Sequence, residues 1–478
     1  MSSALFVVEF KNKRDQRCQS LITSFCLKDL HYCADVDINR RESVQSNEPQ
    51  VQLPSSEEYR FSSTDGIVLE DYVVKPNRQI VKSGSLLQLI GWMTSVENKS
   101  RDFERVFLLM FRSFTSQKCL LELLIERFDI PLPKALQELA DSKASLFEEE
   151  FYRFCLQYRH PIQQRYYFKI TRVLQFMEGK CSKVGFTDLQ KIWVAMIRTE
   201  VNKRLQNTPT ESLLTVVEKH FTDWMFSSTF LLVDSTEFAQ QLTLLQFEIY
   251  RRIRGVEMVD AAWTKTGKEE QSPHVLQMIA MSTNLTYSIA REIVEEVNIT
   301  KRVVLFRKVI QIMVECERLN NFNGVVDLNA ALNCAAVFRL KSTKSKLTVN
   351  EQDRLNHFNK LCEPHGREIA SRLRSCTSAC VPFVGSFLSQ IFLLNVSRSN
   401  FVEQHDGGEI PIISFRKCRK LAALIHSLLK FRRKSFELQP NLHLMKVLMS
   451  LRPEGNFTTR NTLEAYLYER SRQIEPSS

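Results

Sequence analysis

The sequence predicts an all-α protein with a smaller N-terminal helical module and a larger helical domain from which a helical hairpin protrudes. Three observations support this fold class. Glycine and proline are scarce, with 13 and 14 among 478 residues, so few turn-forming residues are present. Apolar residues recur at helical spacing in one segment after another. Neither a strand-rich block nor a GxGxxG or Walker pattern occurs, so we expect no phosphate-binding loop in this chain.

The composition is that of a soluble globular protein with two or three domains, because 44% of the residues are apolar and 25% are charged. The 12 cysteines include no CxxC pair, and no histidine cluster accompanies Cys376 and Cys380, so we expect free thiols in a reducing compartment and no metal site. The N-terminus lacks the features of a secretory signal. Apolar runs such as Val106–Phe111 are far shorter than the ~20 residues of a membrane span. We expect a cytoplasmic protein.

The net charge of +11 admits three kinds of partner, namely nucleic acid, an anionic membrane surface or an acidic protein. The densest basic run is Lys430–Lys434, so a dispersed basic surface is the simpler interpretation. Because neither a clustered basic helix nor an aromatic stacking motif is found, we expect no nucleic-acid binding.

Residues 1–66 form a segment of unclear structure followed by a polar linker. Residues 4–10, ALFVVEF, alternate loosely and are compatible with a strand. Residues 40–66 are rich in Ser, Glu, Gln and Pro and poor in large apolar residues, which is typical of a linker.

Residues 67–205 are predicted to form the N-terminal helical module, followed by a connector over residues 206–234. Ser83–Thr94 is interpreted as a cap followed by a helix with Leu86, Leu89, Ile90 and Met93 on one face, and Phe103–Phe114 and Cys119–Pro131 as further segments of the helical module. The last is closed by its proline.

Residues 235–478 are predicted to form the larger domain. Thr236–Ile253 has the spacing of a helix face. The sequence LNNFNG at Leu319–Gly324 follows a long helical pattern, and its Asn and Gly residues favour a helix stop with left-handed backbone. HExxH, GxSxG and paired CxxC motifs are all missing from the sequence, so nothing indicates bond-making chemistry.

The hairpin is the stretch around which the larger domain is organised. Its first helix is expected at about Phe383–Val396 and has more apolar surface than one core-facing stripe needs. Its second helix opens with the basic run Arg416–Lys420 and continues as a one-faced amphipathic helix to about Leu429. Periodicity leaves two interpretations open: two core helices, or a hairpin with an apolar edge left for a partner.

Four motifs in this order carry a family resemblance: SPHVLQMI from Ser272, NLT from Asn284, LNNFNG from Leu319 and CVPFVG from Cys380. Together they resemble the catalytic domain of Ras-family guanine nucleotide exchange factors, over residues 235 to 476 and down to the IEP that ends at Pro476. The segments FRSFTSQ, LLIERFDIP and FYRFCLQYRHPIQQR are similar to the N-terminal module of the son-of-sevenless branch. In that branch the module is packed on the catalytic domain and helps to hold the hairpin in place.

The resemblance implies a guanine nucleotide exchange factor, in which the hairpin acts as a wedge that opens a Ras-family small GTPase so that GDP leaves and GTP binds. Such a protein acts on the nucleotide and Mg²⁺ of its partner and needs no cofactor of its own. The resemblance is also compatible with a monomer that is recruited peripherally to the inner face of the plasma membrane. Eight positions correspond to the contact surface of the family, and of these Trp263, Asn333 and Phe383 match it in residue type and spacing. Those assigned to catalysis are Phe392, Ser389 and Val396, and those assigned to GTPase binding are Trp263, Asn333, Phe383, Gly385 and Leu388.

Several positions depart from the family pattern. Ala280 replaces an arginine and Gly366 a tyrosine, and the aromatic anchor of a second, distal Ras site is Val173 or Leu174 here. Val396 stands where the family has an acidic residue, and valine cannot replace a charge-assisted hydrogen bond worth ~1.5–3 kcal/mol. Two functions therefore compete: a working exchange factor, which we favour because wedge shape supplies much of the effect, and a non-catalytic GTPase-binding scaffold.

Overall fold

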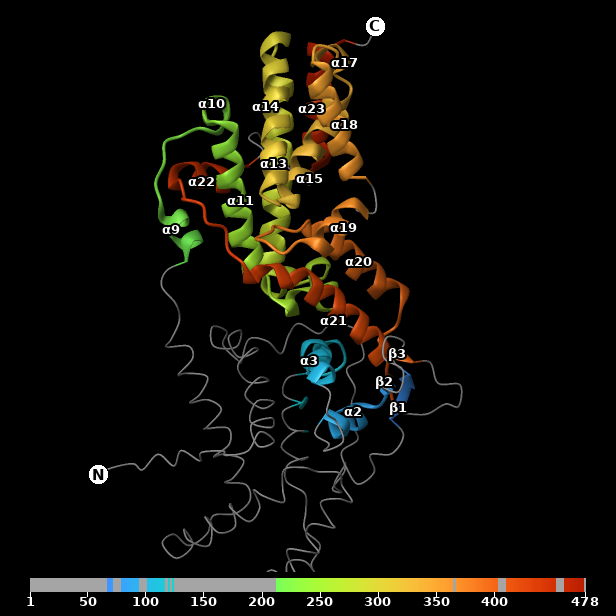
Figure 1. Cartoon of the computed structure of the whole chain (residues 1–478). Helices are drawn as coiled ribbons and strands as arrows, with labels where there is room; N and C mark the ends of the chain where they lie inside the picture. The colour runs from blue at the N-terminus through green and yellow to red at the C-terminus, as the bar shows by residue number, and fades with distance from the viewer. Residues whose placement is uncertain are drawn as a thin grey trace, which may run out of the picture. The chain divides into compact units, whose positions relative to one another are not determined.

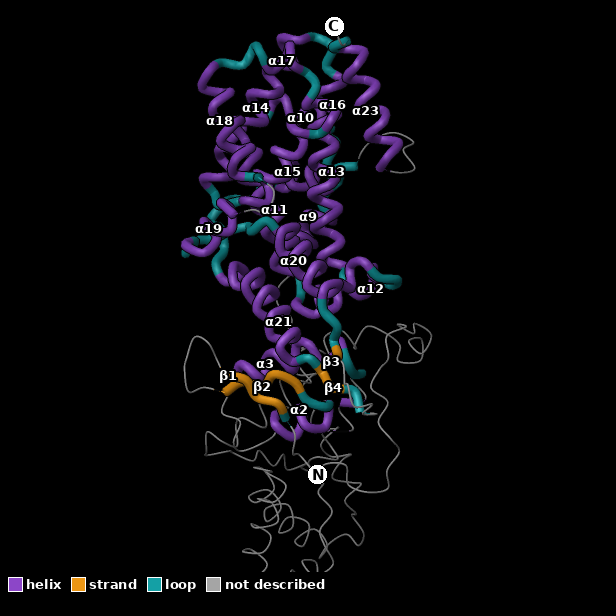
Figure 2. Tube along the Cα trace, turned by 90° about the vertical axis from the view of Figure 1, so that its right-hand side faces the viewer, coloured by secondary structure: helices purple, strands orange, loops and turns teal. Residues whose placement is uncertain are grey.

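The computed structural model describes residues 67–71, 79–93, 101–116, 119–120, 123, 212–363, 367–402, 410–452 and 460–476 (Figure 1). These residues are mostly helical, with two short two-stranded sheets, which confirms the all-α fold class (Figure 2). The chain divides into two compact units. The smaller comprises Met1–Pro209 and Ser397–Ala422, and the larger comprises Thr210–Val396 and Ala423–Ser478.

The smaller unit begins with an antiparallel pair of strands, β1 (Val68–Asp71) and β2 (Gln79–Ser83). Helices α2 (Leu86–Met93) and α3 (Arg101–Met110) follow, and a 3₁₀ turn, η3 (Phe111–Ser113), continues α3. The cap followed by a helix that was predicted within Ser83–Thr94 corresponds to Ser85 and α2. Ser83 belongs to β2, and the helix starts after Ser85, where Ser85 and Gln88 exchange side-chain-to-backbone hydrogen bonds of 2.8 and 3.2 Å.

The loop between the hairpin helices belongs to this smaller unit. It contains a second antiparallel pair, β3 (Phe401–Val402) and β4 (Ile412–Ile413). Ile413 also exchanges two backbone hydrogen bonds with Gly84, at 3.3 and 2.9 Å. The ring of Phe415 stacks on Phe103 of α3 with 4.5 Å between centroids. The tip of the hairpin therefore folds together with the N-terminal segments.

The larger unit is a bundle of helices around α11, α13, α14 and α15, which pack on one another. Aromatic and aliphatic side chains such as Phe238, Leu245, Phe306, Met313 and Leu328 fill its core and are fully buried. In chain order the helices are α9 (Leu213–Lys219), α10 (Phe226–Leu232), α11 (Ser235–Arg252), α12 (Lys268–Gln271), α13 (Pro273–Glu295), α14 (Ile299–Arg318), α15 (Phe322–Asn333), α16 (Ala335–Phe338), α17 (Lys341–Lys344), α18 (Val349–Leu361), α19 (Arg367–Ser375), α22 (Leu442–Met449) and α23 (Arg460–Ile474), with 3₁₀ segments η4 (Gly255–Thr264) and η5 (Lys430–Arg433).

The predicted helix at residues 236–253 is α11, and its start has a clear local cause. The carboxylate of Asp234 accepts hydrogen bonds from the backbone N–H groups of Thr236 at 2.8 Å and Glu237 at 3.4 Å. The bond from Thr236 contributes most to holding the pKa of Asp234 below its usual value. An N-cap of this kind fixes the first turn, so the helix begins where the sequence indicated.

The hairpin consists of α20 (Val384–Ser397) and α21 (Phe415–Leu429). The bounds of α20 differ from the prediction by one residue at each end, and α21 contains the basic run as expected. The border between the two units falls within α21, between Ala422 and Ala423.

Several predictions fall outside the described residues: the strand at 4–10, the linker at 40–66, most of the helix at 119–131, and the departures at 173–174 and 366. Residues 119, 120 and 123 are helical, as predicted. Within the described part of the chain, no helix combines the length and apolar character needed to cross a bilayer.

Candidate functional site

One face of α20 carries apolar side chains that the protein leaves uncovered. Phe392 is 42% exposed, Leu393 64% and Val396 71%, whereas Leu388 and Ile391 are buried. The helix contains no Asp, Glu, Lys or Arg from Val384 to Ser397. The structure explains why the sequence of α20 has more apolar surface than one core contact needs. One face of the helix packs on the core, and apolar side chains on the other face are exposed to solvent. An uncovered apolar edge of this kind is typical of an interaction site.

The eight predicted contact residues lie in different environments. Ser389, Phe392 and Val396 are exposed on α20, at positions i, i+3 and i+7, and so share one face. Leu388 is 6% exposed and faces the core. Trp263 is also buried, at the end of η4, where Asp260 and Ala261 adopt positive φ values of 52° and 54°.

Asn333 is the last residue of α15, and its exposed side chain is held by neighbours. Its Nδ2 donates to the backbone oxygen of Asn329 at 2.9 Å and to Oδ1 of Asn359 at 2.8 Å. These bonds tie the end of α15 to α18 and fix the direction of the amide.

Phe383 and Gly385 are brought together at the start of α20. A Cβ atom on Gly385 would lie 2.8 Å from Cε2 and Cζ of the Phe383 ring, closer than such atoms approach in proteins. Glycine at position 385 therefore lets the half-buried ring fold back over the first turn of the helix.

The LNNFNG motif ends one helix, as the sequence predicted, and it also starts the next. Asn320 has a φ of 56° and adopts the left-handed conformation expected after α14. Asn321 then caps α15 by accepting a hydrogen bond from the backbone N–H of Gly324 at 2.9 Å. A Cβ atom on Gly324 would lie 2.8 Å from Nδ2 of Asn321, so the tight turn requires glycine at this position.

This motif also holds the base of the hairpin, a role that sequence reasoning missed. The backbone oxygen of Val381 accepts from the N–H groups of Phe322 at 3.0 Å and Asn323 at 3.4 Å, and its own N–H donates to the oxygen of Asn320 at 3.1 Å. The backbone N–H of Val384, the first residue of α20, donates to Oδ1 of Asn323 at 3.4 Å. LNNFNG and CVPFVG, which the sequence showed only as separate motifs, thus form one junction.

A buried polar cluster lies beneath this junction. Nδ2 of Asn321 donates to Oε1 of Gln246 at 2.9 Å, and Nε2 of Gln246 donates to Oδ2 of Asp327 at 2.7 Å. Nδ2 of Asn323 donates to the same carboxylate oxygen at 2.9 Å. Burial raises the pKa of Asp327 to about 7, against the effect of hydrogen bonds from Ser282, Gln246 and Asn323.

The start of α13, which carries the SPHVLQMI motif, is capped by the buried carboxylate of Glu257. The carboxylate accepts from the backbone N–H groups of His274 at 2.9 Å and Val275 at 3.1 Å, and from Nε of Arg254 at 3.1 Å. Burial alone would raise the pKa of Glu257, but bonds from His274, Val275 and Arg254 hold it below the usual value. Glu257 thereby fixes the segment that leads to Trp263. The sequence did not predict this role, because Glu257 lies well before the SPHVLQMI motif.

The second hairpin helix is anchored at its C-terminal end within the larger unit. The hydroxyl of Tyr250, on α11, donates to the backbone oxygen of Leu428 at 2.5 Å, and Nη1 of Arg432 donates to the oxygen of Ile253 at 2.7 Å. Burial raises the pKa of Tyr250, so the phenol stays a donor at neutral pH.

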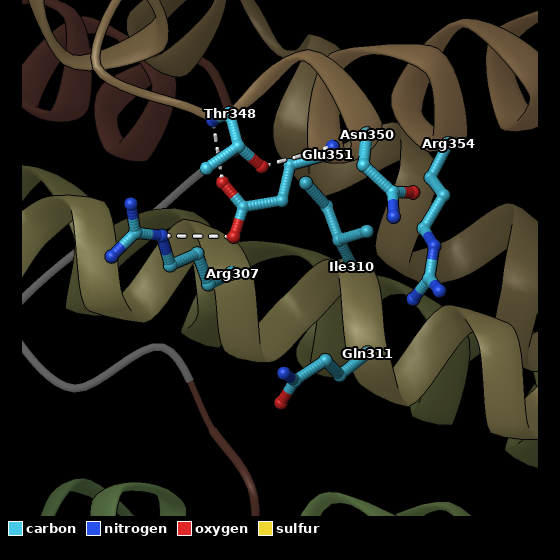
Figure 3. A pocket seen from close by; sticks show the side chains of 7 residues that line it. All are labelled: Arg307, Ile310, Gln311, Thr348, Asn350, Glu351 and Arg354. Atoms are coloured by element: carbon cyan, nitrogen blue, oxygen red, sulfur yellow. Dashed lines mark hydrogen bonds and ion pairs between the residues drawn. The ribbon is translucent and has the colours of Figure 1, made fainter.

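A small polar pocket lies between α14 and α18 (Figure 3). Nε of Arg307 forms an ion pair with Oε1 of Glu351 at 2.9 Å across it. The pocket is lined by Arg307, Ile310, Gln311, Thr348, Asn350, Glu351 and Arg354. None of these residues belongs to the predicted contact set. In the described residues, no group of three or more His, Cys, Asp and Glu side chains is placed to hold a metal ion.

Comparison with known protein families identifies two adjoining domains. Residues 80–238 match the RasGEF N-terminal motif, and residues 237–419 match the RasGEF domain. The second match contains α20 and the whole LNNFNG–CVPFVG junction. The predicted boundaries after residues 66, 205 and 234 stay predictions.

The chain is also similar to curated proteins. It is 27% identical to the son of sevenless homolog of Caenorhabditis elegans, over 92% of this chain and 37% of that protein. It is 28% identical to the protein son of sevenless of Drosophila melanogaster, over 91% of this chain and 29% of that protein. Ras guanine nucleotide exchange factor A of Dictyostelium discoideum is 24% identical, over 83% of this chain and 66% of that protein. The chain spans about a third of the length of the two son of sevenless proteins. It belongs to the RasGEF family and is of the son-of-sevenless-like kind.

Proposed function

We propose that this protein is a guanine nucleotide exchange factor, which inserts its helical hairpin into a Ras-family small GTPase, releases GDP and lets GTP bind. The observation that carries the proposal is the uncovered, uncharged edge of α20 inside a RasGEF domain, formed by Phe392, Leu393 and Val396. In this role the protein acts in small-GTPase signal transduction.

Exchange of this kind needs no bond-making side chain. A GTPase closes over its nucleotide, and a protein that binds the open, nucleotide-free form better than the closed form lowers the barrier to release. Burying an apolar side chain such as Phe392 in the open form stabilises it by about 1.5–3 kcal/mol. The hydroxyl of Ser389 lies one turn earlier on the same face and is free to reach polar groups that the nucleotide leaves.

A wedge must be stiff, because a flexible helix would follow the GTPase rather than open it. In the larger unit, the junction at Val381 fixes the start of α20, and the Tyr250 bond fixes the end of α21. In the smaller unit, Gly84 and Phe103 hold the loop and the start of α21. These anchors hold the base of the hairpin within the larger unit and its loop within the smaller unit.

The protein uses the GDP, GTP and Mg²⁺ of its GTPase and has no cofactor of its own. Phe392 takes the wedge position near Mg²⁺, and Trp263, Asn333 and Phe383 take positions at the GTPase surface. The protein acts as a monomer in the cytoplasm, without nucleic acid, and is recruited to the inner face of the plasma membrane, where lipidated Ras proteins lie.

The test is the release of a fluorescent GDP analogue from a panel of Ras-family GTPases, with the full chain as catalyst. We expect acceleration on at least one member. The Phe392→Ala substitution should slow the accelerated release by roughly 10- to 100-fold, the equivalent of the burial energy of a phenylalanine. Phe221→Ala is a matched control, because Phe221 is 83% exposed on the segment between α9 and α10 and takes no part in the proposed wedge.

One observation favours a second function, that of a non-catalytic GTPase-binding scaffold. Val396, 71% exposed, offers no carboxylate at the position where the family has one. Tight binding to a nucleotide-free GTPase without faster release would support the scaffold, and Val396→Glu should then restore exchange. If the chain shows neither binding nor release, the proposed function is wrong.

A further inference from the structure

We propose that Asn323 and Asp327 are positioning residues for exchange, which fix the base of α20 and make the stiffness of the wedge depend on the charge of Asp327. This inference rests on the proposed function only for its effect on exchange rates. The positioning of the start of α20 does not depend on the proposed function, and hydrogen exchange tests it separately.

The start of α20 depends on a side chain from another part of the sequence. The first N–H groups of a helix have no partner within the helix, and they need an acceptor from outside. The preceding residues, Pro382 and Phe383, have no side-chain acceptor to offer. Oδ1 of Asn323, 61 residues earlier in the chain, accepts from the backbone N–H of Val384 instead. Asn323 thus acts as a distant N-cap for the wedge helix.

An asparagine amide can serve this purpose in only one of its two orientations, because its nitrogen cannot accept a hydrogen bond. Nδ2 of Asn323 donates to Oδ2 of Asp327 and to Oγ of Ser282, both at 2.9 Å. These two acceptors turn Oδ1 toward Val384. The ionised Asp327 carboxylate is a pure acceptor and enforces this orientation, whereas a protonated carboxyl can donate to Oδ1 of a flipped amide and compete with Val384.

Asp327 is the group of this cluster that titrates near neutral pH. Gln246 on α11 and Ser282 on α13 face it with neutral polar side chains. Two thiols lie within electrostatic reach of Asp327, Cys316 on α14 and Cys362 after α18. Burial raises the pKa of both, to about 12 for Cys362, so both stay protonated near neutral pH. Because the pKa of Asp327 lies at about 7, its charge changes across the physiological range. Raising the pH should therefore stiffen the base of the hairpin.

Hydrogen–deuterium exchange of the full chain tests the structural part. In peptides that cover residues 381–397, we expect the protein to exchange more slowly at about pH 8 than at about pH 6, after correction for the intrinsic rate. Asn323→Leu should speed hydrogen exchange at the start of α20 by about tenfold at both pH values, which is the equivalent of losing one buried hydrogen bond. Peptides from α11 and α14 report whether the fold is intact.

Two further substitutions separate positioning from general stability. Asp327→Asn cannot titrate, and its amide, like the protonated carboxyl, can donate to Oδ1 of a flipped Asn323, so the pH dependence at α20 should disappear and hydrogen exchange should stay at the faster, low-pH rate. Thr286→Val is the matched control. Its hydroxyl donates to the backbone oxygen of Asp327 at 3.0 Å and does not touch the carboxylate, so the pH dependence should be retained.

The same variants in the nucleotide-release assay give the functional readout. The wild-type acceleration should rise with pH through about 7, and Asp327→Asn should make it independent of pH in that range. If Asn323→Leu leaves the hydrogen exchange of residues 384–397 unchanged, the inference is wrong. It is also wrong if Asp327→Asn keeps the pH dependence of hydrogen exchange that the wild type shows. If the wild type accelerates release from no GTPase, the proposed function fails, and the hydrogen-exchange result still decides the positioning role.

Discussion

Substituting Glu475 by alanine should destabilise the larger unit by about 3 kcal/mol, because it leaves a buried guanidinium without its carboxylate. Arg302 is 1% exposed, and its Nη2 pairs with Oε1 of Glu475 at 3.2 Å. The carboxylate also accepts from the backbone N–H groups of Ser342 and Thr343 at the start of α17, both at 3.0 Å. Loss of a partner from a buried ion pair costs about 3–5 kcal/mol. The low end applies here because Nη1 of Arg302 keeps its bond of 2.7 Å to the oxygen of Glu296.

A double-mutant cycle distinguishes this ion pair from the other contributions. The double variant Arg302→Met/Glu475→Ala should lose at least about 2 kcal/mol less stability than the two single variants lose together. The reason is that Arg302→Met removes the guanidinium that Glu475→Ala would leave buried without a partner. Glu469→Ala is the control, because Glu469 and Arg472 form an exposed pair on the same helix, α23, and an exposed pair contributes about 0–1 kcal/mol. Urea denaturation of the full chain, followed by circular dichroism, measures the four free energies.

The pH dependence of this pair has a defined sign. Burial alone would raise the pKa of Glu475, but bonds from Thr343, Ser342 and Arg302 hold it below its usual value of 4.5. A carboxyl group with a lowered pKa contributes stability that is present above its unfolded-state pKa and is lost as the pH falls through the folded-state pKa. The cost of Glu475→Ala should therefore shrink in acid. Additive costs, or a cost that is the same at neutral and strongly acidic pH, would refute the reasoning.

Three further predictions follow from the hairpin and its supports. Tyr250→Phe should destabilise the larger unit by about 1–2 kcal/mol in urea denaturation, because the buried oxygen of Leu428 loses its donor; an unchanged midpoint would contradict this role. Gly385→Ala should lower the rate of nucleotide release without unfolding the protein, since the new methyl group displaces the Phe383 ring; wild-type rates would show that the ring position does not matter. Between about pH 5.5 and 8.5 the wild type should lose about 2 kcal/mol of folding stability, and Asp327→Asn should not. The reason is that Asp327 keeps its proton up to a pKa of about 7 in the folded state but releases it near 3.8 in the unfolded state. Equal slopes of stability against pH in urea denaturation would refute this.

The long helices were predictable because their sequences repeat one signal many times. The 14 residues of α20 carry apolar side chains on most of its surface, and the prediction missed its bounds by one residue at each end. The strands β2 and β4 were missed because they are only 5 and 2 residues long, and the partner of Ile413, Gly84, is far away in sequence. So short a strand has no readable period, and its pairing depends on tertiary contacts.

The candidate site was predictable in outline but not in its supports. The exposed edge at Phe392 and Val396 follows from a helix with too much apolar surface for one core contact. The cluster of Gln246, Asn323 and Asp327 brings side chains of α11 and α15 together, and no regular spacing links residues on separate helices. Sequence spacing alone left open whether Trp263 lies in the core or at a contact surface, and the structure buries it.

The contacts of the hairpin loop set a limit on how the two family domains can be separated. Phe415 belongs to the RasGEF match by sequence, yet its ring stacks on Phe103 of the N-terminal match. A chain cut near residue 237 would expose that ring and leave Ile413 without its strand neighbour at Gly84. Residues 397–422 therefore cluster with the N-terminal segment, and exchanging that segment between family members by recombination requires residues 397–422 to be exchanged with it.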